Sequence, residues 1–434
     1  MKTNTKTPQL RTHEGAVAKH ISAEAQLRRS VMSCMLWEGE FYESGTKIAD
    51  RIASLIPQVD ARKVADIAIE ARHAMNLRHV PLQIVKIMAG LPSHKHLVAE
   101  TLGAVIARAD ELSEFVSLYW KDGRKPLSAQ IKKGLAKAFT KFSAYSLGKY
   151  NRDGAVKLRD VLFLCHAKPK DESQAADWWN LVNGTLATPD TWEVALSSGA
   201  NKHETWNRLL AENKLGGLAL LRNLRNMEQA GVDRLRIHTA IRDMSTARIL
   251  PFRFIAAATH APKYEPELED AMFRNLADHP KLPGHTVLMV DVSGSMDAKM
   301  SGKSDLTRID AACGLSMLLR EVCESVEVVT FSNNLATVPP RRGFALRDAV
   351  VRSQPHGGTD LRAAVLFVNK QITPAARMIC ISDEQAATTV PDPKGTAYMI
   401  NVASARNGVG YGAWAHIDGF SEAIVSYIIQ LETK

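Results

Sequence analysis

The sequence predicts a multidomain chain in which an all-helical repeat region precedes a doubly wound α/β region. Its 434 residues, 45% of them hydrophobic, are enough for roughly two to three globular domains with ordinary cores. From about residue 20 to about 250, apolar residues recur at three- and four-residue spacings, as in amphipathic helices. After Pro280 to Gly284 the pattern changes to short apolar runs of strand length that alternate with helices.

The helical region, placed at residues 1–280, is predicted to be an array of helix pairs. Short breaks that contain Gly, Pro or Asp separate its amphipathic stretches. Between Leu127 and Phe142, for example, Ile131, Leu135 and Phe139 share one helical face, and a stripe of lysines is expected to lie in water. Successive helix pairs without strands between them favour a solenoid of the HEAT kind.

The second region, placed at residues 281–434, is predicted to be a Rossmann-like, doubly wound parallel sheet. HTVLMVD, which begins at His285, is a continuous apolar run typical of a buried parallel strand. Three later runs have the same character: VEVVTF (326–331), RMICIS (377–382) and TAYMINVA (396–403). A nearly all-apolar helix is expected over 307–325 and a closing helix over 421–431.

The positive charge is unevenly distributed along the chain. Residues 281–434 contain 15 basic and 15 acidic residues, so residues 1–280, with 40 against 31, supply the whole net charge of +9. Clustered Lys and Arg favour a polyanion partner, because they neutralise phosphates and release counterions. A basic protein without such a partner is the alternative.

The first thirty residues contain no apolar run of the length that a signal peptide or a membrane span needs. We therefore expect a soluble cytoplasmic protein without a membrane partner. The five cysteines have no C-x-x-C spacing, which favours reduced packing residues over redox or zinc sites. They are Cys34, Cys165, Cys313, Cys323 and Cys380.

Oxygen-bearing side chains gather after the first expected strand of the second region. Asp291, Ser293 and Ser295 form a D-x-S-x-S arrangement there, and two later loops add Thr359 and Asp383. Ligands of open α/β folds bind outside the carboxyl ends of the strands, so we expect these side chains to meet in one crevice. Hydroxyl and carboxylate oxygens with few formal charges suit Mg²⁺. The alternative is a turn whose serines and glycine only satisfy backbone groups.

These three segments resemble the metal-ion-dependent adhesion site of von Willebrand factor A domains, and they occur in that family's order. The resemblance implies that residues 281–434 are such a domain with a bound divalent cation. It further implies that Ser293, Ser295 and Thr359 coordinate the ion directly. Asp291 and Asp383 would coordinate it directly or through water.

The same residues do not indicate catalysis. A hydrolase built on Ser293 or Ser295 would need a general base beside the hydroxyl. His285 stands at the opposite end of its expected strand, and His356 is a loop histidine near the site. We therefore expect no catalytic residues and no enzymatic activity.

Five segments before residue 280 carry a second resemblance. They are LRRSVMSCMLWEGEFY (27–42), TWEVALSSG (191–199), KHETWNRLL (202–210), LALLRNLRNM (218–227) and PFRF (251–254). In this order they resemble the TROVE module of the Ro autoantigen family and its bacterial relatives. With the adhesion-site segments behind them, the resemblance covers nearly the whole chain.

This resemblance implies a closed ring of HEAT-like repeats that is latched by the von Willebrand-like domain. It implies that small noncoding, Y-type RNA binds outside, and that single-stranded ends of misfolded RNA enter the central hole. For bacterial relatives it implies an exoribonuclease partner of the polynucleotide phosphorylase type. The implied role is RNA quality control as a ribonucleoprotein.

Individual RNA-binding positions follow from the segment GKYNRDGAVKLRDVLFLCHAKP. It is similar to a family segment in which basic residues and a histidine contact RNA, and the matching positions are Lys149 and His166, with Arg152 nearby. Taken without the resemblance, His166 is instead a histidine at a helix end before Pro169.

Further candidates come from the residues themselves. Lys202, Arg222 and Arg225 lie beside or inside the TROVE-like segments, and guanidinium groups suit both phosphate contacts and stacking on bases. Arg222 and Arg225 share a helical face, but ion pairs to neighbouring helices would explain them equally well. Four tryptophans are more typical of core than of base stacking: Trp178, Trp179, Trp192 and Trp206.

Together these observations predict Ro-type RNA binding by the helical region and a separate Mg²⁺ site in the second region. The alternative is a metal-dependent protein-interaction adaptor without a specific RNA function, in which the ion captures an acidic side chain of a partner. Salt separates the two hypotheses, because binding through many phosphates weakens steeply with salt, whereas capture through a metal responds to EDTA.

Overall fold

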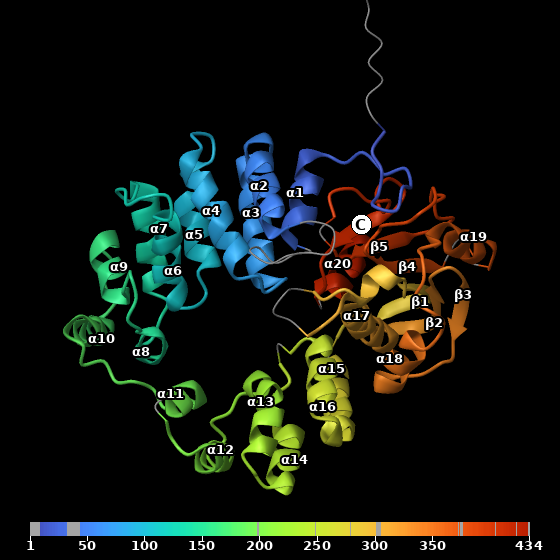
Figure 1. The fold of residues 1–434 in the computed structure, drawn as a ribbon. Helices are drawn as coiled ribbons and strands as arrows, with labels where there is room; N and C mark the ends of the chain where they lie inside the picture. The colour runs from blue at the N-terminus through green and yellow to red at the C-terminus, as the bar shows by residue number, and fades with distance from the viewer. Residues whose placement is uncertain are drawn as a thin grey trace, which may run out of the picture. The chain divides into compact units, whose positions relative to one another are not determined.

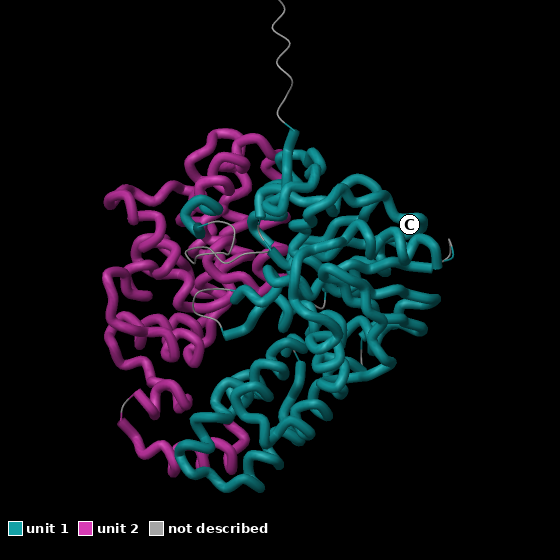
Figure 2. Tube along the Cα trace, turned by 45° about the vertical axis from the view of Figure 1, so that its right-hand side comes forward, with its two compact units in different colours: residues 1–49, 215–434 teal, residues 50–214 magenta. Residues whose placement is uncertain are grey.

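The fold is that of a computed structural model, which describes residues 9–32, 44–197, 199–247, 249–277, 279–300, 305–371, 373, 376–403, 405–421 and 423–432. Contacts divide the chain into two compact units (Figure 2). Unit 1 comprises residues 1–49 and 215–434, and unit 2 comprises residues 50–214. This division by packing differs from the division at residue 280 expected from the sequence, which stays a prediction.

The region before the sheet is helical, as predicted (Figure 1). In order, α1 to α16 span Ala23–Met32, Gly45–Leu55, Ala61–His73, His79–Gly90, Val98–Val105, Asp110–Tyr119, Ala129–Phe139, Ala144–Tyr150, Leu158–Cys165, Glu172–Asn183, Trp192–Ser197, Lys202–Ala211, Gly217–Gln229, Arg234–Asp243, Pro251–His260 and Glu265–Ala277. No helix among the described residues is long and apolar enough to cross a membrane.

Helices of unit 2 pack as successive layers, because α3 contacts α4 and α5, α5 contacts α7, and α7 contacts α9. α7 shows why the sequence folds this way. The Ser128 hydroxyl accepts a hydrogen bond from the Ile131 amide and caps the helix, and Ile131, Leu135 and Phe139 are fully buried on one face. The predicted lysine stripe consists of Lys133, Lys137 and Lys141. It is only partly solvated, because the Lys141 ammonium donates a hydrogen bond to the Gly103 carbonyl at 2.7 Å.

The α/β region of unit 1 contains a six-stranded sheet in the order β3-β2-β1-β4-β5-β6. In chain order, β1 to β6 span Leu282–Asp291, Cys323–Phe331, Leu335–Val338, Arg377–Ser382, Ala397–Asn401 and Ala415–Asp418. The helices α17 to α20 span Arg308–Val322, Gly343–Val351, Leu361–Gln371 and Ala423–Glu432. Only β3 is antiparallel, so the predicted parallel sheet is mixed at one edge.

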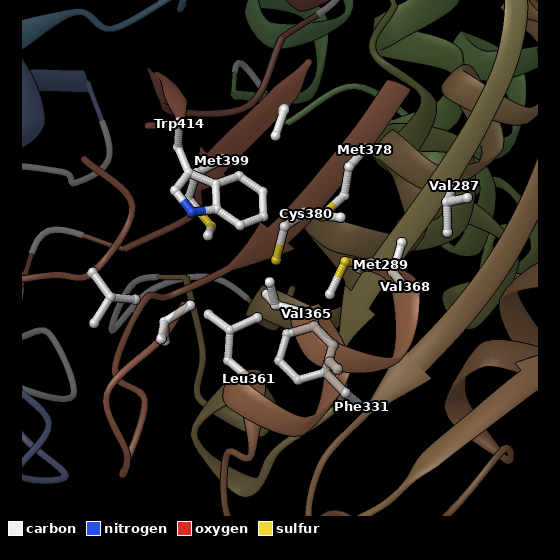
Figure 3. Close-up of a cluster of buried hydrophobic side chains, with 14 of the residues drawn as sticks. Val287, Met289, Phe331, Leu361, Val365, Val368, Met378, Cys380, Met399 and Trp414 are labelled. Carbon is white, nitrogen blue, oxygen red and sulfur yellow. The ribbon is translucent and has the colours of Figure 1, made fainter. Parts of the chain in front are cut away.

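Helices cover both faces of this sheet, which confirms the doubly wound arrangement. On one face, side chains of β1, β2, β4 and β5 pack against Leu361, Val365 and Val368 of α19 (Figure 3). On the other face, α17 contacts β1 and β2, and the Tyr398 hydroxyl of β5 donates to Glu432 of α20 at 2.9 Å. The alternation of side chains along each strand assigns neighbouring residues to opposite faces.

The differences from the expected elements have simple causes. The predicted helix over 307–325 ends at Val322, because β2 begins directly at Cys323. The short edge strands β3 and β6 were not predicted, since each has four residues and incomplete burial, which leaves no apolar run. Four cysteines are free and buried, namely Cys165, Cys313, Cys323 and Cys380, whereas Cys34 lies outside the described residues.

Candidate metal centre and nucleic-acid interface

The candidate metal centre lies at the carboxyl ends of β1 and β4, at the centre of the sheet. Asp291 ends β1, and Asp383 directly follows β4. The Gly294 amide donates to the Gly357 carbonyl at 2.8 Å, which joins the serine turn to the loop before Thr359. The Ser382 hydroxyl donates to Asp291 Oδ2 at 2.6 Å, which joins the β1 and β4 loops. The structure therefore brings together the three loops that the sequence singled out.

Asp291 is fully buried and is held on both oxygens, because its Oδ1 also accepts a hydrogen bond from the Ser293 amide at 2.9 Å. The hydroxyl oxygens of Ser293 and Ser295 are 3.2 Å apart. Burial, and then the nearby Asp383 carboxylate, raise the pKa of Asp291 to about 7. A cation between the two carboxylates would relieve this repulsion.

The other two predicted ligands are also at the crevice. Thr359 is 4% exposed, and its carbonyl accepts a hydrogen bond from the Ala387 amide at 3.3 Å, beyond the end of β4. Asp383 is fully buried, and its Oδ1 accepts a hydrogen bond from the Gln385 amide at 3.3 Å. These contacts hold Thr359 and Asp383 on adjoining loops.

Arg308 is a charged residue of this centre that the sequence reasoning missed. It begins α17 and is 1% exposed, and its Nη1 lies 3.3 Å from Asp383 Oδ2 and 3.4 Å from the Ser295 carbonyl. A guanidinium at this place neutralises part of the buried negative charge. The signal in the sequence was a single arginine at the start of a nearly all-apolar helix.

The donor set fits a hard divalent cation. It offers the hydroxyls of Ser293, Ser295 and Thr359 and two buried carboxylates, which is the oxygen chemistry that Mg²⁺ prefers. Among the described residues, no group of three or more His, Cys, Asp or Glu side chains is arranged to hold a metal. The fit therefore depends on hydroxyl ligands, as in the predicted adhesion site.

His356, the loop histidine near the crevice, is bound to other groups. Its Nδ1 lies 2.8 Å from Asp297 Oδ1, and its Nε2 lies 3.0 Å from the Val351 carbonyl. Burial opposes the charged imidazole, but the hydrogen bonds to Asp297 and Val351 raise the pKa of His356. His356 is thus positioned by Asp297.

The loop that follows Asp383 is held by the N-terminal segment of the chain. Arg29 of α1 is fully buried, with its Nη1 2.8 Å from Glu384 Oε1 and its Nε donating to the Ala405 carbonyl at 2.6 Å. The His13 amide donates to Gln385 Oε1 at 2.7 Å. One step further, the Thr12 hydroxyl donates to the Ala386 carbonyl at 2.7 Å. Three consecutive residues after Asp383 therefore contact residues 12–29.

Glu384 is the centre of this contact, which we call the N-terminal clasp and define as Arg29, Glu384, Tyr411, His416 and Asp418. The backbone of Glu384 has a φ of 61°, a left-handed conformation that side-chain-bearing residues rarely adopt. Burial would raise its pKa, but Arg29 and His416 hold the pKa of Glu384 at about 2. The contacts of the ionised Glu384 carboxylate with Arg29 and His416 thus stabilise this strained backbone.

His416 completes the charge balance of the N-terminal clasp. Its ring contacts Glu384 on one side, and its Nδ1 lies 3.4 Å from Asp418 Oδ2 on the other. The Tyr411 ring stacks on it at 3.9 Å between ring centres. Burial disfavours the charged ring, but Asp418 and Glu384 outweigh this effect and raise the pKa of His416 to about 9.

Four of the six predicted RNA-binding residues lie in unit 2. Lys149 is half-buried near the end of α8, with its Nζ 3.4 Å from Glu193 Oε1, and Arg152 is exposed just beyond it. His166 is the exposed residue that caps the C-terminus of α9 directly after Cys165, with a φ of 52°. Lys202 is the exposed first residue of α12. No hydrogen bond or ion pair between described residues joins these four to one another, so the structure defines no shared site for them.

The other two, Arg222 and Arg225, lie on the exposed face of α13 in unit 1. Within the described part of the chain, neither guanidinium has a carboxylate partner, so the ion-pair explanation finds no support. Both line a pocket together with Arg253 and His260 of α15. Arg253 was missed because only the packing of α13 against α15 brings it there.

The tryptophans mostly belong to the core. Trp206 and Trp178 are buried, and Trp192 stacks on Trp206 at 5.9 Å between ring centres. Trp179 is the exception, with 64% of its surface exposed on α10. Base stacking by Trp178 or Trp206 is thus excluded by burial in this structure.

Comparisons with known proteins agree with this architecture. The TROVE domain family matches residues 183–297, and the Ro60 vWA domain family matches residues 285–396. Lys202, Arg222 and Arg225 fall inside the TROVE match, whereas Lys149, Arg152 and His166 precede it. All five predicted metal ligands fall inside the vWA match.

Two individual proteins can be named. A segment of 90 residues, 19% of this chain, is 34% identical to mouse telomerase protein component 1, but it spans only 3% of that protein's length. The crystal structure of the Deinococcus radiodurans RO (RSR) protein is similar with a TM-score of 0.61 and 17% identity, covering 94% of this chain and 99% of that one. This likeness shows a shared fold. The two domain matches, in the expected order, show that the chain carries a TROVE domain followed by a Ro60 von Willebrand factor A domain.

Proposed function

We propose that this protein binds RNA in the manner of the Ro family. The observation that carries the proposal is the pair Arg222 and Arg225 on an exposed face of α13, inside the TROVE match and without carboxylate partners in the described part of the chain. Unpaired guanidinium groups on a helix surface are suited to phosphate oxygens and to exposed bases. The surplus of positive charge in residues 1–280 supports the same assignment.

The proposed ligands are small noncoding, Y-like RNA and the single-stranded ends of misfolded RNA. The TROVE match supports this choice, and the dispersed residues Lys149, Arg152, His166 and Lys202 would add contacts in unit 2. We further propose that the protein acts in the cytoplasm, in RNA quality control, and delivers RNA to an exoribonuclease of the polynucleotide phosphorylase type. Its role in this proposal is binding, without catalysis.

For the metal centre we propose Mg²⁺ held by Ser293, Ser295 and Thr359, with Asp291 and Asp383 as direct or water-mediated partners. When bound, the ion would supply an open coordination position for an oxygen ligand. Arg308 would position Asp383 and limit the charge that the ion has to neutralise.

The metal centre also supports a second function. In this alternative the protein is an adaptor whose ion captures an acidic side chain of a protein partner, and RNA binding is incidental. The observation in its favour is that hydrogen bonds join three loops around Asp291, whereas a turn that only satisfies its own backbone groups needs no contact with other loops.

Filter binding of the full-length protein to a single-stranded RNA and to a hairpin with a single-stranded end tests the proposal. We expect affinity to fall steeply across three salt concentrations, because each phosphate contact adds about 0.7 to the slope for single strands. Addition of EDTA should leave RNA affinity nearly unchanged. Weak binding with no salt dependence would refute the RNA proposal, and loss of a protein partner on EDTA treatment would favour the adaptor.

A further inference from the structure

α13 and α15 pack against each other in unit 1 (Figure 1). A pocket of about 180 Å³ lies between them. One wall is apolar and includes Leu221, Leu224 and Ala257. The other lining groups are mainly cationic, and Arg222 and Arg225 of α13 face the same space as Arg253 of α15.

The three guanidinium groups are crowded without a compensating anion. Burial, and then the charge of Arg222, lower the pKa of Arg253. Among the described residues, no carboxylate forms an ion pair with Arg222, Arg225 or Arg253. His260, at the edge of the pocket, is different, because its Nε2 lies 3.4 Å from Asp305 Oδ2. Like charges gathered in a partly apolar pocket are unfavourable unless an anion joins them.

The size and shape of the cationic groups indicate which anion fits. Pockets for complete cofactors or drug-sized ligands measure roughly 300 to 1,000 Å³, so this one suits a smaller group. Guanidinium forks match the paired oxygens of a phosphate and bind them with charge-assisted hydrogen bonds. A carboxylate would satisfy one fork, whereas the several oxygens of a phosphate can accept from two or three.

We infer that Arg222, Arg225 and Arg253 form a binding pocket for a single RNA phosphate, with the apolar wall beside the sugar. This inference rests on the proposed function. It adds that Arg253 contacts the RNA and that the pocket holds one phosphate. The phosphate comes either from the backbone of a single strand or from a phosphorylated RNA end, and the chemistry of recognition is the same in both cases.

The test compares two double variants of the full-length protein that remove equal charge. Arg222→Gln with Arg253→Gln removes two of the three guanidinium groups from the pocket. Arg236→Gln with Arg242→Gln removes two exposed arginines from the neighbouring α14. The pocket variant should lose roughly 10- to 100-fold in RNA affinity. Its salt slope should fall by about 0.7, the value for one phosphate, although two charges are lost.

Further arms identify the source of the phosphate. Oligonucleotides with a 5′-phosphate, a 3′-phosphate or hydroxyl ends distinguish a terminal from an internal group, and inorganic phosphate and a mononucleotide serve as competitors. Arg222→Lys with Arg253→Lys keeps the charge but removes the forks, so we expect an intermediate affinity. Thermal unfolding of all variants checks that the helices are intact.

Each outcome is informative. Equal losses in the pocket and α14 variants, or a slope change of 1.4 in both, would overturn the pocket while leaving Ro-type RNA binding in place. If the wild-type protein binds no RNA but binds a mononucleotide that the pocket variant does not, the proposed function fails and the pocket stands. If the protein binds no RNA, no phosphate and no mononucleotide, both the proposed function and the pocket are refuted.

Discussion

The metal crevice and the arginine pocket are built in opposite ways, although both are assigned to ligands that contain oxygen. In the crevice, Asp291 and Asp383 are fully buried, and protein groups already satisfy each carboxylate. In the pocket, Arg222 and Arg225 are exposed, and no carboxylate of the described residues pairs with them or with Arg253. The crevice is therefore preorganised and tied to the stability of unit 1, whereas the pocket gains its balancing charge only from a ligand.

The largest effect is expected from breaking the N-terminal clasp behind the crevice. Arg29→Ala leaves Glu384 buried without its guanidinium partner, and removing one member of a buried ion pair costs about 3–5 kcal/mol. Urea unfolding of the full-length protein measures the loss. Arg62→Ala is the matched control, because its ion pair with Glu100 is exposed and screened by solvent, so we expect a much smaller loss. Similar losses in the two variants would show that the clasp does not stabilise the fold.

Removal of the proposed metal ligands should affect the crevice without affecting the pocket. Ser293→Ala with Thr359→Ala deletes two of the proposed hydroxyl ligands but leaves the hydrogen bond between Ser382 and Asp291 that joins β4 to β1. We expect calorimetric titration to show Mg²⁺ or Mn²⁺ affinity lowered by more than about 100-fold. Even the mutation of residues that only hydrogen-bond to metal ligands lowers metal affinity by about 10- to 100-fold. RNA affinity should stay the same.

Unchanged metal affinity in that variant would contradict the ligand assignment. A matched control is Ser332→Ala, which removes a buried hydroxyl from the neighbouring β2 loop, where it accepts from the Gly357 amide at 2.8 Å. If this control lowers metal affinity equally, loop geometry rather than direct coordination explains both results. A large loss of RNA binding in the ligand variant would show that the two regions share a site.

The N-terminal clasp also predicts how stability changes with pH. The pKa of His416 is about 9 in the folded protein, against an ordinary value near 6.5, because Glu384 and Asp418 face its ring. Its contribution to stability is therefore complete below pH 6.5 and is lost as the pH rises through 9. Arg29 stays charged across this window, and the pKa of Glu384 at about 2 keeps that carboxylate ionised.

Urea midpoints at several pH values between 6.5 and 9 measure this contribution. Stability should decline over that range in the wild-type protein and more weakly in His416→Gln, which cannot titrate. His203→Gln is the control, because this histidine is exposed on α12 in unit 2. Identical pH profiles for the wild type and His416→Gln would refute the role of His416.

The contrast between the regions also explains what the sequence could predict. Asp291, Ser293 and Ser295 were singled out because they lie close together in the sequence at the end of an apolar strand, where the fold class itself predicts a ligand crevice. Arg308 and the partnership of Arg29 with Glu384 depend on side chains that meet only after folding. Nothing in local periodicity distinguishes a buried arginine from a solvated one.

The helical region shows the same limit. Its helices follow from periodicity and caps, and Arg222 and Arg225 follow from a three-residue spacing on one face. Arg253 was hidden inside the apolar run PFRF, and its role depends on α15 packing beside α13. The edge strands β3 and β6 escaped prediction for a different reason, since four half-buried residues carry too little pattern.

The smallest effect is expected in unit 2, where the predicted RNA contacts are weakest in structural support. Lys149→Ala with Arg152→Ala should lower the salt slope of RNA binding by roughly 0.7 to 1.4, for one to two contacts with single strands. The lower end is expected, because the ammonium of Lys149 is already 3.4 Å from Glu193. Lys133→Ala with Lys137→Ala, on the exposed face of α7, should change the slope less.

A third variant makes this last comparison decisive. Glu193→Gln removes the carboxylate beside Lys149, so a lysine that contacts RNA should then bind more tightly and with a steeper salt slope. If Lys149 only stabilises the contact between α8 and α11, the same substitution leaves RNA affinity unchanged and lowers the urea midpoint. Filter-binding isotherms at three salt concentrations distinguish the two results. Equal losses from the Lys149 and Lys133 pairs would mean that total charge governs binding, and the positions inferred from family resemblance would have to be withdrawn.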